Sequence, residues 1–166
     1  MNPGPLRQLL ETLPQRGRVE WIGIRPERGA DMLAVSEIRI ELGSGLEGDR
    51  FKGRDTSPRQ VTLIQHEHLA VIAACLGVAA VSPALLRRNI VVSGINLLAL
   101  KDKQFRLGEA TLEFSGACHP CSKMETALGA GGYNALRGHG GITARVIEPG
   151  LLRVGDPVYY ADAEIR

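Results

Sequence analysis

Residues 104–115 read QFRLGEATLEFS and predict a β-hairpin. Apolar and polar residues alternate before and after the Gly108-Glu109 dipeptide, which is the pattern of two short strands joined by a tight turn. Strands joined in this way are antiparallel. Further short runs rich in β-branched or alternating apolar residues predict more strands at 18–25, 34–42, 60–64, 89–92, 142–147, 151–154 and 158–160.

Helical patterns are few and short. A leucine spacing predicts a helix within residues 1–16 that ends before Pro14, and residues 69–76 predict a second helix that ends at Gly77. Residues 83–86 and 122–128 can each open a short helix. Strands and helices do not alternate regularly, which a doubly wound parallel sheet would require. We therefore expect a mainly β, barrel-like antiparallel domain with a few short helical insertions.

The expected organisation is an N-terminal helical segment at 1–17, a single domain at 18–160 and a tail at 161–166. Of 166 residues, 44% are hydrophobic and 23% are charged, as in an ordinary globular domain. The 20 basic and 18 acidic residues nearly cancel and form no basic stripe, so no nucleic-acid partner is expected. No apolar run approaches the roughly 20 residues of a membrane span, and the start lacks a signal-peptide pattern. These features predict a cytoplasmic protein without a membrane partner.

The sharpest chemical feature is Cys118-His119-Pro120-Cys121, which follows a predicted strand. Two thiols at this spacing can share a zinc ion, exchange a disulfide, or present one thiolate to a ligand while the other supports it. The remaining interpretation is that both cysteines are small buried side chains beside a turn and only fill space in the core. The third cysteine, Cys75, lies in an apolar helical run and is expected in the core.

Two basic stretches suit an anion. Arg87-Arg88-Asn89 offers guanidiniums for phosphate oxygens and an amide for a heterocycle, or else it caps a helix end and faces water. The glycine-rich loop after residue 43 carries four basic residues and is either an anion site or a surface loop: Arg50, Lys52, Arg54 and Arg59.

The histidine and glycine patterns are weaker evidence for a metal site or a dinucleotide site. His66 and His68 are two residues apart, so on a helix they point about 200° from each other and cannot bind one metal ion, whereas on a strand they could converge on one. The glycine-rich runs at 129–132 and 138–141 lack the strand-loop-helix context of a dinucleotide fingerprint. They are expected to form loops that face the cysteine segment.

The chain resembles a known family, the molybdenum cofactor sulfurase C-terminal (MOSC) domain. The resemblance rests on stretches that occur in the family's order and spacing: GLEGDR at 45–50, RRNIVVSG at 87–94, CHPC at 118–121, and the closing segments at 140–146 and 154–158. Together they cover nearly the whole of residues 18–160. The family implies a β-barrel-like fold, which agrees with the strand pattern.

The resemblance also implies a function. In amidoxime-reducing members a cysteine binds the metal of a molybdopterin cofactor, and the matching residue is Cys121. Arg87 and Asn89 match the residues that hold the pterin and its phosphate, and Arg59 lies near another cofactor-facing stretch. Cys118 would support Cys121 or relay sulfur, and the loop 129–141 would form part of a substrate entrance. Arg88 stands where those enzymes have proline, and they carry a further N-terminal β domain.

The implied activity is a molybdenum-dependent oxidoreductase that removes oxygen from small N-hydroxylated substrates. The sequence has no nicotinamide, flavin or iron-sulfur motif, so electrons must come from an external reductase. The alternative is a non-catalytic carrier in which Cys121 holds a persulfide from a sulfur donor protein, or passes the molybdenum cofactor to another enzyme. A zinc-stabilised binding module is the third possibility.

Overall fold

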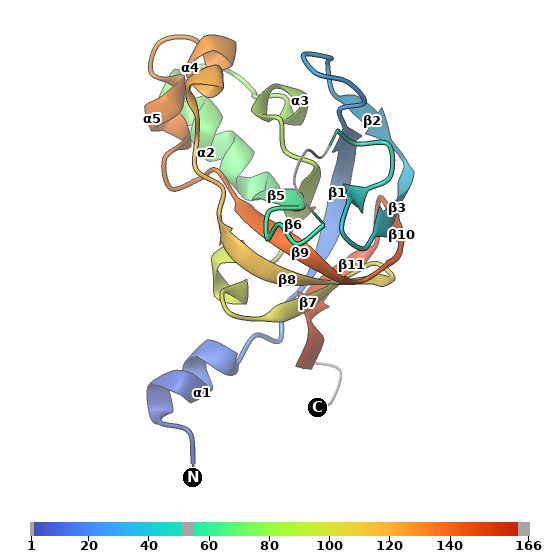
Figure 1. Cartoon of the computed structure of the whole chain (residues 1–166). Helices are drawn as coiled ribbons and strands as arrows, with labels where there is room; N and C mark the ends of the chain where they lie inside the picture. The colour runs from blue at the N-terminus through green and yellow to red at the C-terminus, as the bar shows by residue number, and fades with distance from the viewer. Residues whose placement is uncertain (1, 51–54, 163–166) are drawn as a thin grey trace.

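A computed structural model describes residues 2–50 and 55–162. Seven strands form a closed barrel in the order β11-β7-β8-β9-β5-β6-β1, and pairing between β1 and β11 closes it (Figure 1). Neighbouring strands are antiparallel except for β5 and β6, which are parallel. The predicted mainly β, barrel-like fold is confirmed. The barrel strands are β1 (Arg16–Ile24), β5 (Val61–Gln65), β6 (Ile90–Ser93), β7 (Gln104–Leu107), β8 (Ala110–Ala117), β9 (Ile142–Glu148) and β11 (Pro157–Tyr160).

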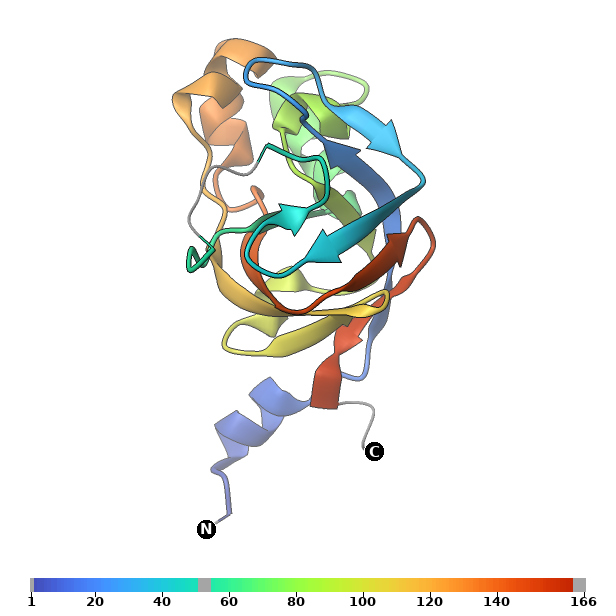
Figure 2. The ribbon, with the colours of Figure 1, turned by 45° about the vertical axis from the view of Figure 1, so that its right-hand side comes forward.

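The strand predicted at 34–42 is divided into two strands that belong to different sheets. β2 (Leu33–Val35) pairs with β1, whereas β3 (Glu37–Glu41) joins β4 (Gly45–Leu46) and β10 (Gly150–Arg153) in a small second sheet. At the break, the Ser36 carbonyl accepts a hydrogen bond from the Val154 N–H at 3.0 Å. Figure 2 shows this second sheet across the face of the barrel.

The helices are short. They are α1 (Pro5–Glu11), α2 (His66–Leu76), α3 (Pro83–Leu86), α4 (Ser122–Leu128), α5 (Gly132–Leu136) and the 3-10 helix η1 (Leu97–Leu100). The predicted stop of α2 at Gly77 is confirmed, because this glycine has left-handed backbone with φ 70°. The α5 helix lies inside the segment expected to be loop, and it forms because Ala135 and Leu136 are buried against neighbouring helices.

Two apolar clusters position these elements. Along β5, Leu63 points into the barrel and the next residue, Ile64, points outward beneath the helices. Val91 of β6 likewise joins the outer cluster, which also contains residues of α2, α3, α4 and α5. Each buried aliphatic side chain of this kind contributes about 1.5–3 kcal/mol. The outer cluster therefore fixes these four helices at one end of the barrel, as Figure 1 shows.

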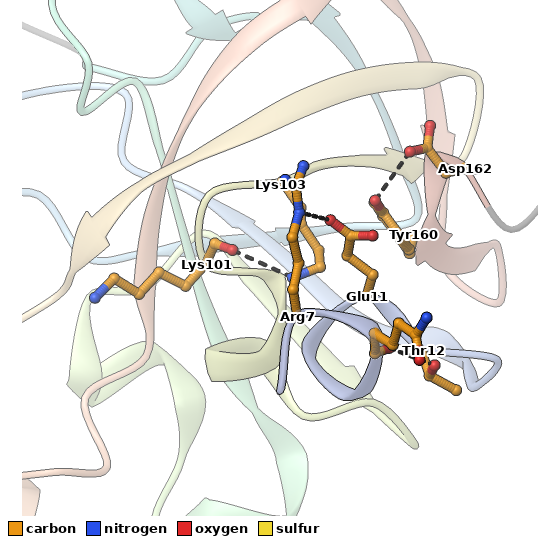
Figure 3. A network of polar contacts seen from close by, with 8 residues as sticks. Arg7, Glu11, Thr12, Lys101, Lys103, Tyr160 and Asp162 are labelled. Carbon is orange, nitrogen blue, oxygen red and sulfur yellow. Dashed lines mark hydrogen bonds and ion pairs between the residues drawn. The ribbon is translucent and has the colours of Figure 1, made fainter. Parts of the chain in front are cut away.

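The α1 helix stands away from the barrel in both ribbon views (Figures 1 and 2). None of its residues is buried, and Leu6, Leu9 and Leu10 are 69%, 72% and 61% exposed. Figure 3 shows its internal ion pair, in which Arg7 Nε lies 2.8 Å from Glu11 Oε1. No helix in the described part of the chain is long and apolar enough to cross a membrane.

The expectation that Cys75 lies in the core is wrong, because the structure places it on the exposed side of α2. The buried stripe of this helix is formed by Leu69, Ile72 and Ala73, with Leu76 partly buried. One residue before Leu76, Cys75 is turned about 100° away from that position and leaves the stripe.

Candidate functional site

The Cys118–Cys121 turn connects β8 to α4 and gives its two thiols different surroundings. Cys118 is buried, with 7% of its surface exposed, and its N–H donates to the Gly141 carbonyl at 2.9 Å. Cys121 is exposed and is the residue just before α4, where its side chain makes no capping hydrogen bond. Both thiols are free. The exposed sulfur of Cys121 is therefore available to a ligand.

Arg88 holds the cysteine turn in place through buried hydrogen bonds. Only 5% of the surface of Arg88 is exposed, and its guanidinium donates to three main-chain carbonyls: Leu86 at 2.8 Å, Gly140 at 2.8 Å and Cys118 at 3.4 Å. Sequence reasoning assigned Arg88 no separate role, although its departure from the family's proline was the available signal. The structure thus joins the arginine segment to the cysteine segment through Arg88.

Arg87 occupies a less common backbone conformation. It ends α3 with φ 59°, in the left-handed region that non-glycine residues rarely adopt, and its side chain is partly exposed. This conformation costs about 1–2 kcal/mol relative to the right-handed one. Such strain at a helix end next to a candidate site is consistent with a functional side chain.

Asn89 joins three barrel strands at the same end. Its Oδ1 accepts from the N–H of Thr62 at 3.2 Å and from the Thr62 hydroxyl at 3.1 Å, and its Nδ2 donates to the Gly23 carbonyl at 3.2 Å. The side chain is buried. Its amide is committed to β5, β1 and the Asp49 carboxyl, so we expect Asn89 to act on a ligand through the shape of the turn that carries Arg87.

A further arginine that the sequence did not indicate, Arg25, is connected to Asn89 through Asp49. The N–H of Arg25 donates to Asp49 Oδ1 at 2.7 Å, and the N–H of Arg50 donates to the Arg25 carbonyl at 2.7 Å. Burial raises the pKa of the Asp49 carboxyl, against hydrogen bonds from the Asn89 side chain and the Arg50 backbone that lower it. Arg25 Nε is buried and has no hydrogen-bond partner among the described residues. An unsatisfied guanidinium donor of this kind suits an anionic ligand.

Arg59 is exposed on the loop before β5, and its side chain forms no hydrogen bond or ion pair with any residue that the structure describes. The next residue, Gln60, is buried and holds the loop. Its Nε2 donates to the Asp55 carbonyl at 3.0 Å, and its Oε1 accepts from the Val146 N–H at 2.9 Å. Of the other basic residues singled out in this loop, Lys52 and Arg54 lie outside the described residues.

Glycine residues let the loop at 138–141 approach the barrel closely, as the sequence predicted for a loop that faces the cysteine segment. Gly141 has φ 87°, and a Cβ there would lie 1.9 Å from the Leu63 carbonyl oxygen. Only glycine fits this position. The Cys118–Gly141 hydrogen bond depends on that approach.

A cavity of about 480 Å³ lies beside the cysteine turn. His68 from α2 and His139 from the glycine loop line it, with ring centroids 5.2 Å apart in an edge-to-face arrangement. His66 does not line it, which agrees with the argument that the two α2 imidazoles diverge. No group of three His, Cys, Asp or Glu residues in residues 2–50 and 55–162 is arranged to hold a metal ion, so the zinc interpretation gains no support.

Comparisons with solved structures show the same fold. The YuaD protein of Bacillus subtilis superimposes with a TM-score of 0.75 at 22% identity, over 87% of this chain and 95% of that chain. YiiM from Geobacillus stearothermophilus gives 0.70 at 15% identity, over 87% and 75% of the two chains. YiiM from Escherichia coli gives 0.64 at 23% identity, over 87% and 69%. A search of curated proteins gave no match.

The family comparison is specific. The model of the MOSC domain matches residues 48–159, which is most of the barrel and includes both the arginine and the cysteine segments. This family is associated with the molybdenum cofactor. The chain belongs to the MOSC domain family.

Proposed function

We propose that this protein binds the molybdenum cofactor through Cys121 and reduces small N-hydroxylated compounds. One observation carries the proposal: an exposed, uncommitted thiol at Cys121 lies on a turn that Arg88 ties to the arginine and asparagine segment. A soft thiolate is a suitable ligand for molybdenum, and guanidiniums suit the cofactor's phosphate.

The donor set of the chain fits such a cofactor. Arg87 is partly exposed at the end of α3, and the unsatisfied Nε of Arg25 offers a second donor for an anion. Two residues before Arg25, Gly23 is hydrogen-bonded to Asn89 through both its N–H and its carbonyl. We assign the phosphate to Arg87 and Arg25, with Asn89 shaping the turn between them. Arg59 is proposed as a further residue that faces the cofactor, and only the resemblance to the family supports this role.

When bound, the cofactor supplies two-electron oxygen-atom transfer. The overall reaction balances as R–NH–OH plus two electrons and two protons giving R–NH₂ and water. An external reductase provides the electrons. In this scheme Cys121 anchors the cofactor, and Arg88 keeps the Cys118 carbonyl in place so that the turn presents Cys121 outward. The free thiols suit a reducing compartment, and we place the protein in the cytoplasm.

The decisive experiment measures metal and activity together. Protein purified from a molybdenum-replete host is analysed for molybdenum per chain and assayed for reduction of benzamidoxime with a chemical electron donor. We expect stoichiometric molybdenum in the wild type and its loss in Cys121→Ser. The matched control is Cys75→Ser, which removes an exposed thiol on α2 and should retain both.

Molybdenum retained at full occupancy in Cys121→Ser would remove Cys121 from the proposal. Wild-type protein without molybdenum, but with sulfane sulfur released from Cys121 by a reductant, would instead establish the persulfide carrier.

A further inference from the structure

The cavity between α2, η1 and the cysteine turn has the features of a ligand site that lacks the proposed cofactor donors Cys121, Arg87 and Arg25, although part of the loop expected at a substrate entrance lines it. Its volume of about 480 Å³ lies within the range of small-molecule pockets in proteins. Apolar side chains form much of its lining, including Leu97, Phe114 and Ile142. A few polar groups converge on it, of which His68 and His139 are in mutual contact. Cys121 is not among its lining residues.

No acidic side chain of the described residues lines the cavity. The described lining residues include three histidines and no carboxylate. Behind the wall, buried Arg88 donates to the carbonyls of Cys118 and Gly140, which both line the cavity, and it forms no ion pair among the described residues. A buried guanidinium without a carboxylate partner leaves a positive potential at this wall. The cavity therefore favours an anionic or strongly accepting ligand group.

The groups around His68 come from α2, the glycine-rich loop 138–141 and the cysteine turn. His139 contacts it edge to face, His119 and Cys118 line the same cavity, and Glu67 precedes it on α2. The Glu67 carboxylate accepts from the Gly94 N–H at 2.7 Å. Burial lowers the pKa of His68, His139 lowers it further, and Glu67 opposes both. An anion bound against His68 would oppose the effect of burial and favour the protonated ring.

We propose that this cavity binds a small aromatic molecule that carries a carboxylate or similar anionic group, with the ring against the apolar lining and the anion on His68 and His139. The proposal does not depend on the molybdenum cofactor. It predicts that affinity for the anion rises as the pH falls and His68 gains a proton.

The test uses three probes of nearly equal shape, namely benzoate, benzamide and benzamidine, added to the purified full chain. Titration calorimetry gives their affinities, and histidine ring NMR signals locate the site. We expect benzoate to bind more tightly than benzamide and benzamidine to bind most weakly. The double variant His68→Gln/His139→Gln should weaken benzoate by about tenfold, the usual worth of a charge-assisted hydrogen bond, and should remove the pH dependence.

His66→Gln is the matched control, since it changes an exposed imidazole in the same helical turn, and it should bind benzoate like the wild type. Ala117→Trp is the second variant. It adds a large side chain at an exposed position of the lining and should abolish binding. Equal binding of benzoate and benzamidine, an unchanged benzoate affinity in the double histidine variant, or no saturable benzoate binding in the millimolar range would each overturn the proposal.

Discussion

Arg88 Nε donates a hydrogen bond to the Gly140 carbonyl at 2.8 Å, which joins a residue that precedes β6 to a loop that precedes β9. From the same guanidinium, Nη2 reaches the Cys118 carbonyl at 3.4 Å. One buried cation thus holds together the two loops that border the cysteine turn. The buried charge of Arg88 has no carboxylate partner among the described residues. Because a main-chain carbonyl carries no net charge, several of them, oriented toward the guanidinium, are needed to stabilise it.

Replacing Arg88 with Met should lower the free energy of unfolding by about 2–4 kcal/mol, because three buried carbonyls lose a charged donor. Urea denaturation measures this change. In the same variant the Cys118 thiol should react faster with a thiol reagent, since its turn is released. A variant as stable as the wild type, with Cys118 still protected, would show that Arg88 does not fasten the turn.

Arg87→Gly should lower cofactor binding without lowering the stability of the fold. Glycine adopts φ 59° without the steric cost that arginine carries, so the variant should be as stable as the wild type or up to about 1 kcal/mol more stable. If Arg87 holds a phosphate, the same variant should lose molybdenum content. A clear loss of stability would instead show that the Arg87 side chain is mainly structural.

Gly141→Ala should be strongly destabilising, by more than about 3 kcal/mol, because the new Cβ would overlap the Leu63 carbonyl and β5 would have to move. Gly138→Ala is its matched control: φ is 80°, but nothing lies within 4 Å of the added Cβ. That change should cost only about 1 kcal/mol of backbone strain. Thermal unfolding of the two variants compares them directly, and similar losses would show that close packing at Gly141 is unimportant.

Local patterns predicted most strands because their side chains alternate or are β-branched. They did not show that the strand at 34–42 is broken at Ser36, since that break depends on pairing with β10, more than a hundred residues later. The α5 helix was missed for a related reason. Its buried residues, Ala135 and Leu136, are few and lie between glycine runs that favour loops.

The candidate site was predictable where a motif carries the chemistry, as in the cysteine turn. The sequence does not show which of the two cysteines is buried, and only the folded structure shows that Cys118 is buried and Cys121 exposed. His68 and His139 are separated by 70 residues, and neither lies in a recognisable motif with the other. The sequence did not indicate Arg25 either, because the hydrogen bond from its main-chain N–H to Asp49 exists only in the folded chain.

The three cysteines should react at two rates. Cys75 and Cys121 are exposed and should be alkylated rapidly by iodoacetamide in the native protein, whereas Cys118 is buried and should react only as its turn opens. Mass spectrometry of digested samples over time identifies each site. Rapid modification of Cys118 alongside the other two would contradict its burial, and unfolding in urea should make all three equally reactive.

The imidazole of His68 should make stability depend on pH. Its folded-state pKa lies below the ordinary value of 6.5, since burial and His139 both disfavour the charged form. The neutral form is therefore favoured by folding, and this contribution is fully present above the unfolded pKa and is lost as the pH falls through the folded value. Between about pH 7.5 and about pH 5 the wild type should lose more stability than His68→Gln. His66→Gln, with its exposed ring, should follow the wild type. Melting temperatures across this range provide the measurement, and parallel curves for the wild type and His68→Gln would mean that the His68 ring titrates alike in the folded and unfolded chain.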